Sequence, residues 1–94
     1  MKQNVVKKQP GGKSTAESQT ENLRQIILHN DDVNTFDHVI SALIQICEHD
    51  SIQAEQCAYI THYKGKCDIK SGSYKELSPM KTALLERGLQ VTID

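Results

Sequence analysis

The strongest constraint on the fold is an abrupt change of hydrophobic pattern near residue 30. The segment Leu23–Leu28, LRQIIL, is rich in aliphatic and β-branched residues and is typical of a strand. It is followed by three polar side chains, Asn30, Asp31 and Asp32. Apolar residues then recur at steps of three and four, which predicts one face of an amphipathic helix: Phe36, Val39, Ile40, Leu43, Ile44 and Cys47. The chain therefore passes from strand to helix through residues 30–35 (NDDVNT), which we call the acidic turn.

Capping residues mark where the first two helices begin and end. Asn34 or Thr35 can cap the start of the first helix, because their side-chain oxygens can accept a free backbone N–H. Asp50 or Ser51 can do the same for a second helix. Gly65 predicts the end of that helix, since glycine readily adopts the left-handed conformation of a C-terminal cap.

Two periodicities describe the segments that follow. Small residues share one stripe of the second helix: Ala54, Cys57, Ala58 and Thr61. Cys67 and Ile69 alternate with polar residues, which indicates a short, half-exposed strand. Leu89, Val91 and Ile93 alternate in the same way and predict a last strand.

A third helix is harder to place because of Pro79. Ser73 and Glu76 have the spacing of a capping box. Pro79 lacks the N–H that a helix interior uses, so we expect the main helix over residues 78–87, after a helical lead-in turn. Its inner side is predicted to carry Leu77, Met80, Ala83, Leu84 and Arg87, and Gly88 is the stop signal.

Together the elements predict an α/β (α+β) domain in the order β-α-α-β-α-β. A three-stranded sheet needs cover on at least one face, and three helices can provide it. At 94 residues and 37% hydrophobic content, the chain has material for one small core. We therefore expect a single folded domain over residues 21–94. Residues 1–20 contain Pro10, Gly11 and Gly12 among many polar side chains, and are expected to form a flexible N-terminal extension.

Composition restricts the partners and the compartment. The formal net charge is −1, so no basic field favours nucleic acid or an anionic membrane surface. No apolar run approaches the length of a membrane span. Three cysteines, an odd number, fit a reduced compartment better than a disulfide framework. We therefore expect a cytoplasmic protein with neither a nucleic-acid nor a membrane partner.

Three features together resemble one family. These are the acidic turn, the segment His62–Lys66 (HYKGK) and a strand at the C-terminus of the sequence. The chain is similar, from about Leu23 to Asp94, to the ClpS family of Clp protease adaptors. The resemblance implies a fold like the C-terminal domain of the ribosomal stalk protein. It also implies a function: to bind substrates with destabilising N-terminal residues and hand them to a Clp AAA+ unfoldase.

The resemblance implies that four residues bind the α-amino group of a substrate, namely Asn30, Asp31, Asp32 and His62. The chemistry is reasonable. An N-terminal ammonium, with a reference pKa of roughly 7.7–8.0, needs several acceptors and a nearby negative charge. The asparagine oxygen and an aspartate carboxylate supply both, and a neutral histidine ring nitrogen can also accept.

The family alignment also implies a hydrophobic pocket for the first side chain of the substrate. Its residues would be Asn34, Phe36, Val39, Ala58, Thr61 and Leu89. Such a pocket suits large apolar residues, for which burial yields roughly 1.5–3 kcal/mol. This sequence departs from the family pattern, which often has Thr-Pro in place of Asn34-Thr35 and methionine in place of Phe36 and Ala58. We expect large aromatic first residues to be accepted.

The remaining implications concern delivery. The expected partner is the N-terminal domain of a ClpA-like or ClpC-like unfoldase, with the adaptor working as a monomer and the N-terminal extension used during engagement. Lys75, Glu76 and Lys81 are candidate contacts with the chaperone, although a solvated helix face is the more ordinary explanation of these charges. No cofactor, metal or catalytic residue is expected.

Other interpretations remain open at this stage. Asn30 and Asp31 could merely stabilise a turn, and the apolar pocket residues could simply be core. A zinc site from Cys47, His49, Cys57, His62 and Cys67 is disfavoured, because their spacings lack the short paired ligands of structural zinc. A Cys57–His62 nucleophile and base is disfavoured because Cys57 should face the core. The main alternative is a small scaffold or ribosomal-stalk-like interaction module without a peptide pocket.

Overall fold

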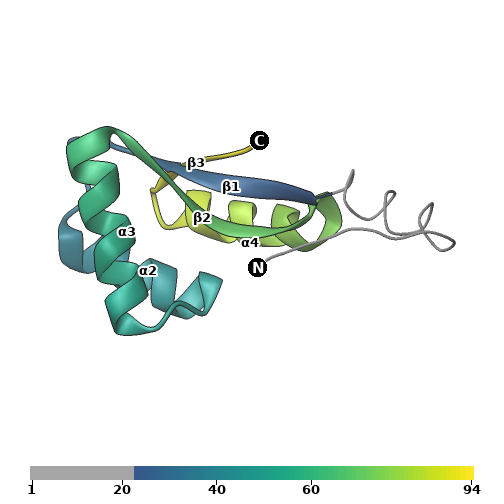
Figure 1. Ribbon diagram of the computed structural model, residues 1–94, viewed down its shortest axis with the longest axis horizontal. Coiled ribbons are helices and arrows are strands. Elements are labelled where there is room, and N and C mark those ends of the chain that lie inside the picture. Colours follow the sequence, from purple (N-terminus) through teal and green to yellow (C-terminus); the bar gives the residue numbers. More distant parts are fainter. Residues whose placement is uncertain (1–22) are drawn as a thin grey trace, which may run out of the picture.

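A computed structural model describes residues 23–94. Their elements follow the order β1 (Leu23–His29), α2 (Phe36–Cys47), α3 (Ser51–Lys64), β2 (Lys66–Ser73), α4 (Tyr74–Glu86) and β3 (Gln90–Ile93). The predicted β-α-α-β-α-β order and α+β class are confirmed. In Figure 1, α4 runs along one face of the sheet, while α2 and α3 pack together at one end of the molecule. The expected flexible extension, residues 1–20, lies outside the described residues.

The sheet is antiparallel, with β1 in the centre and strand order β2-β1-β3. The register pairs Ile26 with Lys70 but Ile27 with Asp68, so β2 has one extra residue at Ile69. Such a bulge bends the strand and increases its twist. At the other end of β1, Leu28 pairs with Cys67 and with Val91, so the acidic turn emerges from the central strand.

Local hydrogen bonds explain where α2 and α3 begin and end. Thr35 is the N-cap of α2, and its hydroxyl accepts the N–H of His38. Asp50 is the N-cap of α3, and its carboxylate accepts the N–H of Gln53. Gly65 ends α3 with a φ of 97°. A residue that has a side chain would adopt this conformation only at a cost in free energy.

Helix α4 begins four residues earlier than the sequence analysis expected, at Tyr74 rather than Ser78. The capping box is complete: the Ser73 hydroxyl accepts the Glu76 N–H, and the Glu76 carboxylate accepts the Ser73 N–H. Pro79 lies inside the helix, where its missing N–H removes only one intrahelical bond. The capping box and the complete burial of Leu77 offset that loss, so the lead-in turn and the main helix are continuous.

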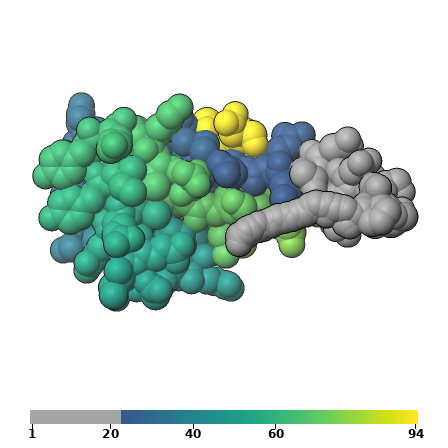
Figure 2. Space-filling model, in the orientation of Figure 1, coloured from purple at the N-terminus to yellow at the C-terminus, as the bar shows by residue number. Residues whose placement is uncertain are grey.

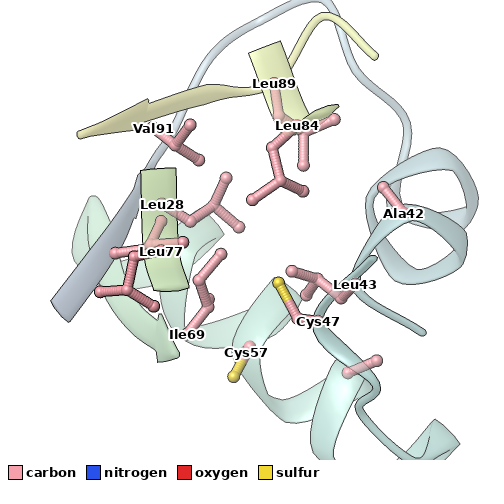
Figure 3. Close-up of a cluster of buried hydrophobic side chains, with 12 residues drawn as sticks. Leu28, Ala42, Leu43, Cys47, Cys57, Ile69, Leu77, Leu84, Leu89 and Val91 are labelled. Atoms are coloured by element: carbon pink, nitrogen blue, oxygen red, sulfur yellow. The ribbon is translucent and has the colours of Figure 1, made fainter. Parts of the chain in front are cut away.

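The core lies between the sheet and the helices (Figure 3). Side chains from β1, α2, α3, β2, α4 and β3 converge there, including Ile26, Leu28, Leu43, Cys47, Ala54, Ile69, Leu77, Leu84 and Val91. The predicted small-residue stripe of α3 is buried as a whole, because Ala54, Cys57, Ala58 and Thr61 all face inward. Ile44, expected on the inner face of α2, is 39% exposed instead. Within residues 23–94, no helix has the length and apolar content that crossing a bilayer requires.

Candidate functional site

A cavity of about 380 Å³ opens where the acidic turn meets α2 and α3. Its wall is polar on the side of the turn and apolar on the side of the two helices. The lining residues are Leu28, His29, Asn30, Asp31, Asp32, Asn34, Thr35, Phe36, Val39, Ala58, Thr61 and His62. All four residues expected to bind an α-amino group, and all but one of those expected in the hydrophobic pocket, therefore surround one hollow.

Asp31 organises the acidic turn. Its Oδ1 accepts the backbone N–H groups of Val33 and Asn34, each at 2.8 Å. Its Oδ2 accepts the side-chain amide of Asn34, also at 2.8 Å. Burial by itself would raise the pKa of Asp31, but the bonds from Asn34 and Val33 outweigh it and hold the pKa below its ordinary value. Asp31 therefore carries a negative charge at neutral pH while it holds the turn in shape.

Two hydrogen bonds fix the acidic turn against the ends of other helices. The backbone N–H of Asn30 donates to the carbonyl of Gly65 at 2.9 Å, beside the C-terminal end of α3. The side-chain amide of Asn34 donates to the carbonyl of Gly88 at 2.9 Å, just beyond α4. Because His62 lies in the last turn of α3, the first of these bonds brings His62 to the same cavity as the turn.

Several acceptors at the cavity have spare hydrogen-bonding capacity in the described part of the chain. Within residues 23–94, the side chains of Asn30, Asp32 and His62 make no hydrogen bond to another protein group. The Oδ2 of Asp31 accepts one bond and retains capacity for another. The C-terminal end of α3 adds the negative end of a helix dipole to the same side. This side of the cavity can hold a small cation that donates several hydrogen bonds.

The opposite wall is apolar. Phe36 and Val39 come from the first turn of α2, and Ala58 and Thr61 come from the inner stripe of α3. Thr61 donates its hydroxyl to the carbonyl of Cys57 at 2.8 Å, which satisfies its polar group within the helix. Ala58 ends at Cβ and so leaves space that a longer side chain would fill. This wall can receive an uncharged side chain.

Leu89 is the one predicted pocket residue that does not line the cavity. It is 1% exposed and belongs to the core cluster. The end of α4 explains its position: the Gly88 N–H donates to Leu85 and the Leu89 N–H donates to Leu84, which is a Schellman motif. That motif brings its last residue against the helix, and Figure 3 shows Leu89 next to Leu84, among the core side chains.

Three lining residues were not predicted from the sequence, namely Leu28, His29 and Thr35. Leu28 and His29 end β1 immediately before the acidic turn, and Thr35 ends the turn itself. Their adjacency to Asn30 and Asn34 was a signal that could have identified them. His29 also bonds across the sheet, because its Nε2 lies 2.9 Å from the Thr92 hydroxyl.

The candidate chaperone contacts lie on α4, apart from the cavity lining. Lys75 and Glu76 are exposed, whereas Lys81 is half-buried. The backbone N–H and side chain of Ser73 lower the pKa of Glu76 through the capping box. Glu76 therefore has a structural role that is independent of any partner.

The cysteines and histidines do not form a joint site. Among residues 23–94, no three His, Cys, Asp or Glu side chains are grouped so that they could hold a metal ion. Cys57 faces the core, and burial raises the pKa of its thiol. Burial and the hydrogen bond with Cys57 raise the pKa of Cys67 to about 12. His62 points to the exposed side of the same helix, so it is not placed to deprotonate Cys57.

Comparisons with known proteins agree with this architecture. A family model described as "ATP-dependent Clp protease adaptor protein ClpS" matches residues 19–92. None of the curated proteins matches the sequence. A similar solved structure is that of Agrobacterium tumefaciens ClpS2 bound to L-phenylalaninamide. Its TM-score is 0.71 at 19% identity, over 78% of this chain and 95% of that chain. At this identity the likeness to ClpS2 shows the fold.

Proposed function

The chain belongs to the ClpS family of ATP-dependent Clp protease adaptors, and from this premise we propose that it binds the free N-terminus of substrates whose first residue is large and apolar. The observation that carries the proposal is one cavity with two different walls. Acceptors that have no partner among residues 23–94 line one wall, and Phe36, Val39 and Ala58 line the other. An N-terminal residue is an ammonium and a side chain joined at one carbon, so it needs both walls at once.

The polar wall is suited to the ammonium. An α-amino group is largely protonated near neutral pH, since its reference pKa is roughly 7.7–8.0. It has three donors, and the cavity offers Asn30, Asp31, Asp32 and His62 as acceptors. His62 accepts in its neutral form through the ring nitrogen that carries no proton. The carboxylates and the C-terminal end of α3 supply the negative potential that a cation needs.

The apolar wall is suited to the first side chain. Burying a Leu or Phe side chain yields roughly 1.5–3 kcal/mol, which is comparable to the contribution of the polar contacts. Ala58 leaves depth below the rim, and Phe36 supplies an aromatic wall for stacking. We therefore infer that large aromatic residues are accepted along with leucine.

The relative's ligand supports the same chemistry. ClpS2 is bound to L-phenylalaninamide, which has a free α-amino group, a benzyl side chain and an amide in place of the next peptide bond. Those are the three parts of an N-terminal phenylalanine. We transfer this ligand class to the present chain as part of the proposal.

Delivery completes the proposed function. The adaptor, acting as a monomer, would dock on the N-terminal domain of a ClpA-like or ClpC-like unfoldase. The exposed start of α4 with Lys75 and Glu76, and Lys81 further along, are the proposed contacts. Residues 1–20 would be engaged by the unfoldase during transfer. A chain beginning at residue 21 would then bind substrate normally but deliver it more slowly.

Binding of matched peptides tests the central claim. Fluorescence anisotropy would compare a labelled peptide that begins with phenylalanine with its N-acetylated form. Acetylation removes the charge and two of the three donors, so we expect an affinity loss of at least about tenfold, since hydrogen bonds to charged groups contribute about 1.5–3 kcal/mol. Equal binding of the two peptides would refute the adaptor function and leave a scaffold without a peptide pocket.

A pair of charge variants sharpens the test. Asp32→Asn removes a carboxylate at the cavity, and Glu86→Gln removes an exposed carboxylate on α4. Both change the net charge equally. We expect only Asp32→Asn to weaken binding of the free peptide. Equal weakening by both variants would mean that long-range charge, and not the cavity, attracts the peptide.

A further inference from the structure

The side-chain amide of Asn34 is held in one orientation. Both hydrogens of its nitrogen are used, since Nδ2 donates to Oδ2 of Asp31 at 2.8 Å and to the carbonyl of Gly88 at 2.9 Å. Turning the amide over would bring its oxygen against these two acceptors, which an oxygen cannot satisfy. The backbone N–H of Asn34 also donates to Oδ1 of Asp31 at 2.8 Å. The oxygen of the Asn34 side chain, Oδ1, therefore points in a fixed direction.

That oxygen is an acceptor without a protein partner in the described part of the chain. Among the buried and half-buried side chains of residues 23–94, the one polar atom that is both fully covered and unpartnered is Nδ1 of His49. Oδ1 of Asn34 also has no partner there, so it is not fully covered and remains open. Because Asn34 lines the cavity, we infer that the cavity is where this oxygen is open.

Asn34 and His62 are fixed near opposite neighbours of the central strand. Strand β1 lies between β2 and β3. The Asn30 N–H bonds to Gly65, which joins α3 to β2, whereas the Asn34 amide bonds to Gly88, which precedes β3. Oδ1 of Asn34 is close to Gly88, because a Cβ at Gly88 would lie 3.8 Å from it. An ammonium held beside His62 is therefore on the β2 side, and its side chain can extend toward Oδ1 of Asn34 on the β3 side.

We propose that Oδ1 of Asn34 accepts a hydrogen bond from the first side chain of the substrate, so that the cavity binds tyrosine and tryptophan more tightly than phenylalanine and leucine. This inference rests on the proposed function, because the ammonium must be held at the acidic turn. Tyrosine and tryptophan each combine a flat apolar ring with one uncharged donor at its edge.

The two walls of the cavity match those two parts of the ring. Phe36, Val39 and Ala58 contact the apolar faces, and Oδ1 of Asn34 accepts the phenol O–H or the indole N–H. A phenylalanine or leucine side chain displaces water from this oxygen and offers no donor in return. An acceptor left without a partner costs free energy, so the cavity discriminates by one hydrogen bond as well as by size.

The test compares peptides that differ by one hydroxyl group. Two labelled peptides begin with tyrosine and with phenylalanine and share the remaining sequence, and fluorescence anisotropy measures their affinities for the unmodified full chain. We expect the tyrosine peptide to bind about three- to tenfold more tightly, which is the range of one neutral hydrogen bond. Equal affinities, or tighter binding of the phenylalanine peptide, would refute the inference.

Two variants assign the preference to Asn34. Asn34→Ala removes the acceptor, and Thr61→Val removes a hydroxyl from the same cavity without changing the shape of the side chain. Thr61 is the matched control because its hydroxyl donates to the Cys57 carbonyl while its oxygen can still accept. Thr61 faces the inside of α3, whose outer side forms the surface at its end of the molecule in Figure 2, so Thr61→Val leaves that surface unchanged.

The readout is the ratio of the two affinities. Asn34 also holds Asp31, so Asn34→Ala weakens both peptides, but a loss common to both cancels in the ratio. We expect the tyrosine-to-phenylalanine ratio to fall to about one in Asn34→Ala and to persist in Thr61→Val. A ratio that persists in Asn34→Ala, or that falls equally in both variants, would overturn the assignment.

A measurement on the unmodified chain does not depend on either variant being folded. The side-chain carbonyl carbon of Asn34, Cγ, can be followed by NMR while each peptide is added. A new hydrogen bond to Oδ1 changes the chemical shift of that carbon, so we expect a larger change with the tyrosine peptide than with the phenylalanine peptide. Equal changes with both peptides would contradict the proposed contact.

The outcomes separate this inference from the proposed function. If the phenylalanine peptide binds and its acetylated form does not, the cavity functions as proposed, and a missing preference for tyrosine refutes the role of Asn34 alone. If acetylation has no effect on either peptide, the proposed function itself fails. If Oδ1 of Asn34 accepts instead from the ammonium, Asn34→Ala weakens both peptides equally and no preference for tyrosine exists, which would also refute the inference.

Discussion

The two junctions at which a strand passes into a helix differ in length and in composition. Between β2 and α4 there is no connecting segment, because Ser73 ends the strand and caps the helix. Between β1 and α2 the chain uses the whole acidic turn, from Asn30 to Thr35. Both helices nevertheless start in the same way, with a hydroxyl that accepts the N–H three residues on at 3.1 Å.

The difference shows that the acidic turn exceeds what helix initiation requires. Thr35 alone supplies the cap of α2, as Ser73 does for α4. The carboxylate of Asp31 stabilises the turn by accepting three hydrogen bonds from Val33 and Asn34. Asn30 and Asp32 have side chains that the described part of the chain does not use. A junction with surplus acceptors at a cavity is what a binding site for a cation needs.

The largest effect should come from Asp31→Ala at the longer junction. The substitution removes three hydrogen bonds and a negative charge from the cavity wall. We expect the free energy of unfolding to fall by about 1–3 kcal/mol and peptide affinity to fall by at least about tenfold. Urea denaturation and anisotropy with the phenylalanine peptide would measure the two losses. If affinity is retained in a destabilised variant, the turn serves the fold alone.

A smaller and selective effect should come from Ser73→Ala at the shorter junction. It removes the hydroxyl that accepts the Glu76 N–H. Loss of such a cap lowers the free energy of unfolding by about 1 kcal/mol. Because Ser73 lies outside the cavity lining, we expect the affinity for the phenylalanine peptide to be unchanged. An affinity loss as large as that of Asp31→Ala would show that the two junctions are not functionally distinct.

The smallest effect concerns the carboxylates that each junction holds ionised. The Asn34 and Val33 bonds hold the pKa of Asp31 below its ordinary value despite its burial, and the Ser73 bonds lower the pKa of Glu76 below its ordinary value. A carboxyl group whose pKa is lowered on folding adds stability above its unfolded pKa, and this stability is lost as the pH falls through the folded pKa. We therefore expect both junctions to loosen only in acid, below about pH 4.

Carboxyl carbon NMR would record both titrations in one experiment. In the variant Asn34→Ala, Asp31 loses its side-chain partner, so its pKa should rise toward the ordinary value. The pKa of Glu76, at the other junction, should not move. A shift in the pKa of both groups, or a pKa of Asp31 above the ordinary aspartate value in the unmodified chain, would contradict this account.

Local patterns in the sequence were sufficient for most of the fold. Composition predicted the first strand, alternation the other two, steps of three and four the first helix, a stripe of small residues the second, and capping residues the third. The sequence limited the first cap to Asn34 or Thr35 and the second to Asp50 or Ser51; Thr35 and Asp50 are the caps, and Gly65 ends α3 as predicted. Such ends are predictable because caps depend on hydrogen bonds within three or four residues. The start of α4 was predicted wrongly, since the proline rule was given more weight than the complete capping box at Ser73. The start of α4 at Tyr74 depends in part on the burial of Leu77, which is a tertiary contact.

The cavity, in contrast, was decided by tertiary structure. The sequence alone placed Asn30, Asp31 and Asp32 in one turn. It did not show which of their side-chain oxygens accept hydrogen bonds within the turn and which do not. Ala58 and His62 lie beside the turn because α3 packs against the rest of the domain and the N–H of Asn30 bonds to Gly65 at its end. Leu89 is turned into the core by the end of α4. Secondary structure follows from interactions a few residues apart, whereas a hollow exists only where segments distant in the chain pack with space between them.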